Sequence, residues 1–319
     1  MEQAARGAVV VPFMIGFFLR RLGESILAIW GVVTIVFFVT RVLGDPAALL
    51  LPIGASAADI EALRDQLGLN QPLMVQYFHF LTSALQGDFG ISFQHGRDAM
   101  EVVLERLPAT ATLAFTAIAL GLVIGAVAGS IAALKRGSAV ELLVMAGALL
   151  GQATPVFWLG IMLILFFSVN LGWLPTGGYG TIWHLILPAI TLAVFVSASI
   201  ARLLRSSMLD ILQEDYIRTA KAKGLLRSTV FFWHVARNAL IPVVTMTAIL
   251  TGELLGGSVV TETVFAWPGI GRLIIQAIAA KDFPIIQAGI TLIAAIFVLI
   301  NFLVDLLYGV LDPRIRQAR

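Results

Sequence analysis

The sequence predicts an all-α membrane protein with six transmembrane helices. Hydrophobic residues make up 59% of the 319 residues and charged residues only 13%, and the mean hydropathy is +0.95. Between residues 142 and 201 there is no Asp, Glu, Lys or Arg. The length alone allows two soluble domains, but a soluble core does not need such a stretch, whereas two helices in lipid do.

Six apolar runs are long enough to cross a bilayer, which takes about 20 residues per helix. A segment of turn formers and interfacial aromatic residues, 172–180, separates the third run from the fourth. The first run is too long for a signal peptide and lacks a small-residue cleavage site, so we expect an uncleaved helix. The predicted spans are 22–43, 108–134, 142–171, 184–206, 239–261 and 284–309.

The basic residues are distributed unevenly between the two sides of the predicted bundle. If the N-terminus is cytoplasmic, 15 of the 21 Lys and Arg residues lie inside, as the positive-inside rule requires. Both termini are therefore predicted to be cytoplasmic. Residues 1–21 form a cytoplasmic N-terminal extension in this scheme, residues 22–319 form the transmembrane domain, and 207–238 form its main cytoplasmic segment.

Residues 41–107 are predicted to form a helical extracytoplasmic insertion between the first and second spans. Ser56, with an Asp three residues later, can cap a helix that ends at Gly68. A second helix is expected from Pro72 to Leu85, with Gly87 after it. The block carries eight acidic and four basic residues, a net charge of −4. Two interpretations of this block stay open. It is a solvated cap, or it is a functional lid or docking surface at the outer mouth of the bundle.

A short polar segment, Asp215–Gly224, lies between two apolar runs and is compatible with a helix. Asp215 lies at its start while Lys221 and Lys223 lie near its end, which matches the helix dipole. Gly224 allows a left-handed cap that turns the chain. We interpret the segment as a helix that docks against a soluble partner. The alternative is a solvated loop whose lysines follow the positive-inside rule.

Glu253 is the most informative polar residue inside a predicted span, because a carboxylate there is costly and by default faces the bundle interior or water. Gly256 and Gly257 leave space beside it. Glu253 either lines the translocation path or pairs with a second subunit, and the sequence does not separate these alternatives. In the last span, Asn301 and Asp305 lie four residues apart and are expected to form one polar contact.

Two further patterns concern the shape of the spans. Gly121, Gly125 and Gly129 recur every four residues, which predicts close helix packing. The third span contains Gln152, Thr154, Pro155 and Trp158, which mark a proline bend or a site that lines the path.

Catalytic chemistry is absent from the sequence. It has no GxxxxGK[ST] phosphate loop, no cysteine and four scattered histidines, and no Ser/His/Asp or paired-carboxylate arrangement. Neither a metal site nor nucleic-acid binding is indicated, because basic residues cluster only where the membrane topology requires them. The chain is therefore predicted to be a transport subunit rather than an enzyme, with its energy source in another chain.

Several separated segments together resemble the inner-membrane permeases of dipeptide, oligopeptide, nickel and glutathione ABC importers. They occur in the order typical of that family and cover nearly everything after residue 20. The segments are Gly44-Asp-Pro46, Gln86-Gly-Asp-Phe-Gly90, Asp215–Gly224, Arg237-Asn-Ala-Leu-Ile-Pro242, Trp267-Pro-Gly-Ile-Gly271 and Leu311-Asp-Pro-Arg-Ile-Arg316.

The resemblance implies a multi-pass protein of the bacterial inner membrane that imports peptides, or alternatively glutathione or a nickel or other metal chelate. It implies four partners: a second permease, two cytoplasmic ATPases that hold ATP and Mg, and an extracytoplasmic substrate-binding protein. No cofactor is expected in this chain. A self-powered secondary transporter is the less favoured alternative, because no internal repeat is visible.

Candidate residues fall into three regions: the coupling segment and the outer-face motifs belong to the segments that carry the resemblance, whereas the path candidates come from the polar and glycine residues within the spans. The family motif begins Glu-Ala-Ala, whereas this chain has Arg218-Thr219-Ala220 there. Residues for coupling to the ATPase are Asp215, Tyr216, Arg218, Thr219, Ala220, Lys221, Lys223 and Gly224. Candidates for the translocation path are Glu253, Gly256, Gly257, Gln152, Thr154 and Trp158. Candidates for the outer gate or the binding-protein contact are Asp88, Phe89, Trp267, Pro268 and Gly269.

Overall fold

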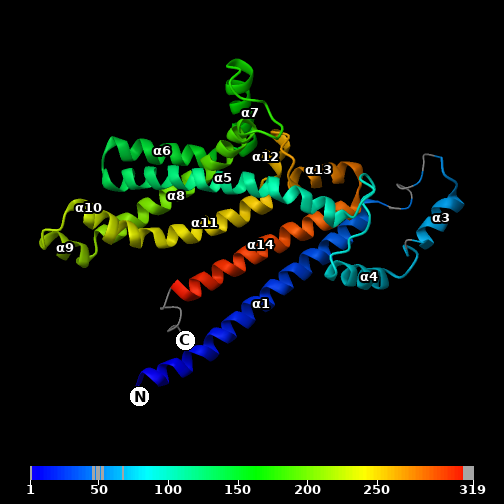
Figure 1. Cartoon of the computed structure of the whole chain (residues 1–319), viewed down its shortest axis with the longest axis horizontal. Coiled ribbons are helices and arrows are strands. Elements are labelled where there is room, and N and C mark those ends of the chain that lie inside the picture. The colour runs from blue at the N-terminus through cyan, green and yellow to red at the C-terminus, as the bar shows by residue number, and fades with distance from the viewer. Residues whose placement is uncertain (1, 45–46, 48–50, 52–53, 67, 312–319) are drawn as a thin grey trace. The chain divides into compact units, whose positions relative to one another are not determined.

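A computed structural model of the chain describes residues 2–44, 47, 51, 54–66 and 68–311. Helices joined by turns make up this part, and its one isolated β-bridge joins Ile91 to Asp98 (Figure 1). Five helical stretches are long and apolar enough to cross a membrane, and a bent helix pair makes up to six. The predicted all-α membrane fold is confirmed.

The chain divides into two compact units. Unit 1 comprises Met1–Thr110 and Pro268–Arg319, and unit 2 comprises Ala111–Trp267. Helix α5 (Ala99–Leu134) begins in unit 1 and continues into unit 2. The remaining helices of unit 1 are α1 (Glu2–Leu43), α3 (Ala57–Gln66), α4 (Leu73–Leu85), α13 (Ile270–Ala280) and α14 (Phe283–Leu311).

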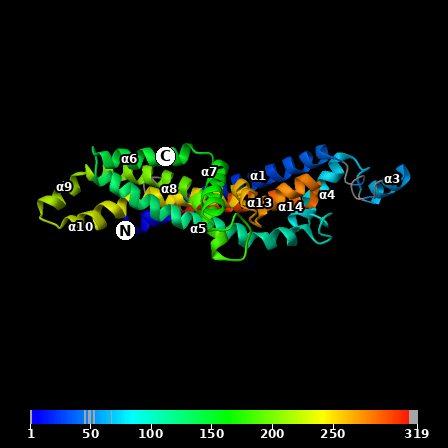
Figure 2. The ribbon, with the colours of Figure 1, turned by 90° about the horizontal axis from the view of Figure 1, so that it is seen from above.

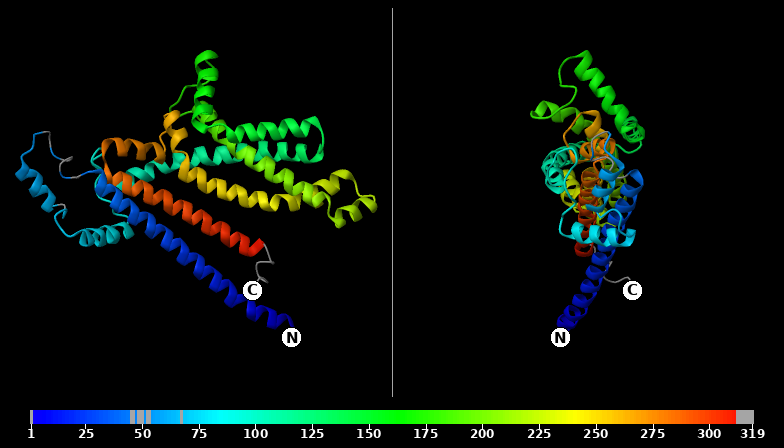
Figure 3. Two further views of the ribbon diagram at one scale, coloured as in Figure 1. Left: turned by 180° about the vertical axis from the view of Figure 1, so that it is seen from behind. Right: turned by 90° about the vertical axis from the view of Figure 1, so that its right-hand side faces the viewer.

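In unit 1, the long helices α1 and α14 lie side by side and run in opposite directions (Figures 1 and 3). Arg21 of α1 forms an ion pair with Asp305 of α14 at 3.0 Å, and Gln287 donates a hydrogen bond to Thr40 at 2.8 Å. Asn301 instead donates to the carbonyl of Phe297. The predicted contact between Asn301 and Asp305 is therefore wrong, because each side chain has another partner.

The two helices predicted within residues 41–107 are present as α3 and α4. Ser56 and Asp59 form a reciprocal capping box, in which each residue's backbone amide donates to the other's side-chain oxygen at 3.2 Å. Gly68 and Gly87 both have positive φ, 66° and 78°. Helix α4 ends with amide-to-carbonyl bonds from Gly87 to Ala84 and from Asp88 to Ser83, which is the Schellman arrangement.

Unit 2 contains the other helical segments. Gly121, Gly125 and Gly129 of α5 lie so close to α8 that an added Cβ would come within 2.5–2.7 Å of Val196, Ser197, Ile200 or Ala201. The predicted close packing of this face is confirmed. The segments are α6 (Ala139–Ala153), α7 (Val156–Leu163), η1 (Ile164–Asn170), α8 (Ile182–Leu212), α9 (Asp215–Ala222), α10 (Arg227–Thr229), η2 (Val230–Ala236), α11 (Arg237–Gly257) and α12 (Val259–Val264).

The third predicted span is a broken helix. Helix α6 ends at Ala153, Thr154 and Pro155 lie outside helix, and the segment Val156–Asn170 continues at 102° to α6 (Figure 3). Proline explains the break, since it lacks an N–H and clashes with the preceding turn. The predicted bend is thus confirmed, with an angle far larger than an ordinary proline kink.

Three sequence-based boundaries differ from the structure. Helix α5 begins at Ala99, nine residues before the predicted span, and the stretch that contains α11 begins at Arg227 rather than at 239. The residues between the fifth and sixth predicted spans are mostly helical, in α12 and α13. Apolar runs mark lipid thickness, whereas helical hydrogen bonding continues into the polar flanks.

Candidate functional site

Helix α9 lies at the tip of unit 2, beyond the ends of α5 and α6 (Figures 1 and 2). Its eight residues are amphipathic. Ile217 has an exposed fraction of 0% and Ala220 is also buried, whereas Arg218 and Thr219 are exposed. The helix is thus held on the unit by a small apolar face and presents a polar face outward, the arrangement expected of a docking helix.

The end of α9 is a complete Schellman motif. Gly224 has φ of +77°, its amide donates to the carbonyl of Lys221 at 3.0 Å, and the amide of Leu225 donates to that of Ala220 at 3.3 Å. These are the two bonds that define the motif, with glycine at the left-handed position. The glycine cap predicted from sequence is confirmed, and it turns the chain back toward α10.

A hydrogen bond ties α9 to the start of α11. The side-chain amide of Asn238 donates to the hydroxyl of Tyr216 at 3.0 Å and to the carbonyl of His234 at 3.0 Å. The ring of Tyr216 stays 42% exposed. A force on α9 can therefore pass directly into α11, the helix that carries Glu253.

The candidate coupling residues do not all face one way. Lys221 follows the buried Ile217 by four residues, so the two share a helix face, and Lys221 lines a hollow between α9 and the rest of unit 2. Asp215, Arg218 and Thr219 are exposed, with Arg218 3.5 Å from Asp215. The outward face is therefore the one that can meet a soluble partner.

The translocation-path candidates lie on two elements of unit 2. Glu253 is exposed on α11 and has no hydrogen bond or ion pair among the residues that the structure describes. Gly256 is half-buried, and Gly257 is the last residue of α11. Gln152 and Thr154 are half-buried at the break before α7, and Trp158 is 50% exposed. Both roles proposed for Glu253 stay open.

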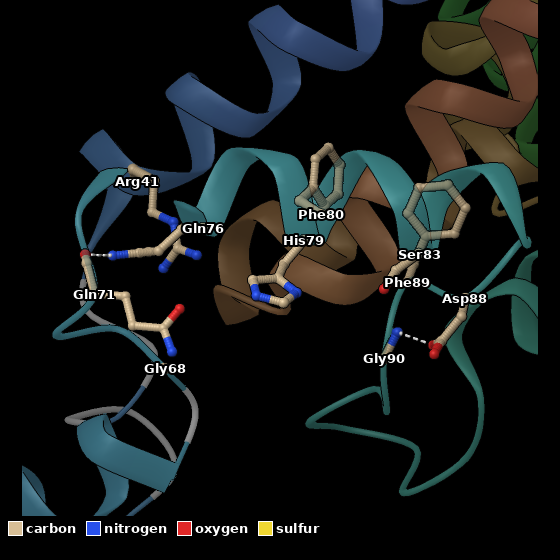
Figure 4. Close-up of a pocket in the computed structure, with 10 residues that line it drawn as sticks. All are labelled: Arg41, Gly68, Gln71, Gln76, His79, Phe80, Ser83, Asp88, Phe89 and Gly90. Carbon is tan, nitrogen blue, oxygen red and sulfur yellow. Dashed lines mark hydrogen bonds between the residues drawn. The ribbon is translucent and has the colours of Figure 1, made fainter. Parts of the chain in front are cut away.

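Asp88 and Phe89 of unit 1 differ in their surroundings. Asp88 is exposed and accepts a hydrogen bond from the amide of Gly90 at 2.9 Å. The pair lines a hollow of about 440 Å³ with Gln76 and His79, and Figure 4 shows these side chains around it. Phe89 turns into the apolar core that α5, α13 and α14 build. Asp88 is thus available to a partner, whereas Phe89 is mainly structural.

Trp267, another outer-face candidate, is buried with an exposed fraction of 2%. Its ring packs edge-on against Tyr179 at 4.8 Å, and its amide donates to the carbonyl of Glu262 at 2.8 Å. In this conformation the indole anchors the 172–180 segment and does not offer a surface to a binding protein. Pro268 is half-buried and Gly269 buried, at the turn into α13.

Two buried carboxylates were missed by sequence reasoning. Glu262 is fully buried and accepts a hydrogen bond from Ser258 at 2.8 Å. Asp282 is 1% exposed and accepts bonds from the hydroxyl of Ser92 at 2.5 Å and the amide of Gln94 at 3.1 Å. Asp282 thereby fixes the segment after Phe89 to the corner between α13 and α14. No local pattern predicts this contact across 190 residues of sequence.

Comparison with known proteins assigns the family. Residues 121–317 match the binding-protein-dependent transport system inner membrane component, and residues 14–114 match the N-terminal membrane component of the same systems. The chain belongs to this family. It is therefore a multi-pass inner-membrane permease subunit of an ABC importer and not a catalytic enzyme.

Curated relatives and solved structures agree with this assignment. The glutathione transport system permease proteins GsiC of Escherichia coli K12 and Pectobacterium atrosepticum are each 44% identical over 304 residues, 95% of this chain and 99% of theirs. The fold resembles the inward-facing MetNI methionine ABC transporter, with TM-score 0.55, 21% identity and coverage of 67% of this chain and 97% of that one. An amino acid ABC transporter gives TM-score 0.51 at 18% identity, covering 67% and 94%.

Proposed function

We propose that this chain is one permease half of an ATP-driven importer for short peptides, and that glutathione, itself a tripeptide, belongs to its cargo class. The observation that carries the proposal is the 44% identity to glutathione permeases across 95% of the chain. A dipeptide or longer oligopeptide as main cargo, and a metal chelate, are the outcomes against which glutathione is tested.

The proposed machinery comprises this permease, a second related permease, two cytoplasmic ATPases and an external substrate-binding protein. ATP and Mg bind in the ATPases, since this chain has no phosphate-cradling loop. The exposed face of α9 is the proposed contact with the ATPase. The left-handed turn at Gly224, which ends α9, and the hydrogen bond between Asn238 and Tyr216, which joins α9 to α11, support it.

Uptake by the complete complex tests the proposal. We would co-purify the chain with its host's partner subunits, reconstitute the complex in vesicles, and supply labelled glutathione, a dipeptide, a hexapeptide or a nickel chelate. ATP-dependent uptake of glutathione is expected, and uptake should vanish without ATP. Uptake of the nickel chelate alone, or ATP binding by this chain purified by itself, would contradict the proposal.

A further inference from the structure

Beneath α9, unit 2 has a hollow of about 520 Å³ that no proposed transport role uses. Volumes of roughly 300–1,000 Å³ are typical of small-ligand sites. The hollow is bounded by the ends of two long apolar helices, at Leu134 of α5 and Leu212 of α8. It therefore lies where membrane-spanning segments leave the bilayer, on the side that carries most of the basic residues.

The lining of this hollow is graded from apolar to basic. Val230 and Val235 are buried at its floor, and Phe231 is half-buried beside them. Lys221 and Arg227 are exposed at its rim. No acidic residue lines it, and neither cation has an ion pair within the described ranges of the chain. Two cations without ion pairs above an apolar floor are complementary to a ligand that joins an anionic group to an apolar chain.

Neighbouring aromatic residues indicate the level of the membrane surface. Phe232 and Trp233, in the same turn of η2 as the hollow's floor, are 66% and 67% exposed. Exposed aromatic side chains next to basic ones are typical of the interface between headgroups and acyl chains. The hollow is thus within reach of lipid, which favours a lipid over an acidic side chain of a soluble partner.

We propose that this hollow binds an anionic phospholipid, with its phosphate between Lys221 and Arg227 and the start of one acyl chain on Val230 and Val235. Cytoplasmic leaflets carry anionic lipids that attract basic residues near the surface. The bound lipid would contact the side of α9 that faces the rest of unit 2, while the outward face of α9 meets the ATPase. The site goes beyond the proposed transport function and does not depend on the cargo.

Native mass spectrometry of the purified complex, titrated with phosphatidylglycerol or phosphatidylcholine, tests the proposal. We expect selective binding of phosphatidylglycerol that weakens about fivefold in Lys221→Gln and in Arg227→Gln, the effect of losing one basic residue near an anionic headgroup. Lys223→Gln is the matched control, since Lys223 is exposed nearby but does not line the hollow. Its binding should equal that of the wild type.

Four results would overturn the proposal. Equal binding of the two lipids would show that no anionic site exists. An equal loss in Lys223→Gln would show a diffuse charge effect. Complete displacement by millimolar inorganic phosphate would show that the apolar floor is not used. A crosslink from Lys221 to an ATPase carboxylate would show that a soluble partner, not a lipid, occupies the site.

Discussion

Replacing Gly224 with Val is expected to uncouple transport by straining the end of α9. The residue has φ of +77°, and an added Cβ would meet nothing within 4 Å. The whole penalty therefore comes from the backbone, at about 1–2 kcal/mol for an L-residue in the left-handed region, with a β-branched residue at the upper end. That free energy lowers the population of the docking-competent turn roughly 5–30-fold.

A graded series at Gly224 separates backbone strain from other effects. Asn tolerates left-handed φ better than other non-glycine residues, so uptake per assembled complex should fall in the order Gly, Asn, Ala, Val. ATPase activity and substrate uptake would be measured together in vesicles. We expect uptake to fall more steeply than complex yield.

Gly137 provides the matched control, because its φ is +78° and an added Cβ also meets nothing within 4 Å. It lies in the turn between α5 and α6 and forms no part of α9 or of the turn that ends it. Gly137→Val should lower thermal stability by a similar amount and leave uptake per complex unchanged. If Gly137→Val uncouples as strongly as Gly224→Val, or if Asn is no better than Val at 224, the reasoning is refuted.

Three further perturbations test other parts of the chain. Glu253→Gln should preserve assembly and reduce uptake of cationic peptides most if the carboxylate lines the path; a weaker complex with equal loss for all cargo would instead indicate pairing with the second permease. Deleting residues 56–86 should leave the spans inserted and reduce stimulation by the binding protein; unchanged stimulation would exclude a lid or docking role. Gly177→Ala should destabilise the complex, because the added Cβ would lie 2.4 Å from the carbonyl oxygen of Phe265. Gly147→Ala is the control: its Cβ meets open space, so the change should be neutral or stabilising by up to about 1 kcal/mol. Equal melting temperatures for the two variants would contradict this prediction.

The features that sequence predicted well are local ones. The stops at Gly68, Gly87 and Gly224 need only a glycine and the carbonyls of the preceding turn, so a short window contains all the information. The capping box at Ser56 is local in the same sense.

Of the family motifs, Asp45, Pro46 and residues 312–316 lie outside the described residues.

The features that the sequence did not predict depend on distant parts of the chain or on no recognisable local pattern of residues. Glu262 carries no mark that distinguishes it from Glu253, yet the first is fully buried and the second exposed. Likewise, Ala266 and Lys281, which follow the ends of α12 and α13, have φ of 50° and 56°, where glycine would be the usual choice. Both residues occupy the left-handed position of a Schellman-type helix end, in which the amides of Trp267 and Asp282 donate to the carbonyls of Glu262 and Ala277.

The break between α6 and α7 has a consequence for how the chain survives in a bilayer. Hydrocarbon offers no hydrogen-bond partner, so non-helical backbone at membrane depth is tolerated only against protein or water. Pro155 supplies no amide to the preceding turn, and the first amides of α7 lack intrahelical partners.

On one side of the break, Gly151 packs closely on Val194 of α8, and the hydroxyl of Thr154 donates to the carbonyl of Leu150. The other side is less covered, since α6 has no fully buried side chain. The uncovered side of the break therefore has to face protein or water, because its unpaired backbone groups would be costly in hydrocarbon. The break thus restricts which side of α6 and α7 can face lipid.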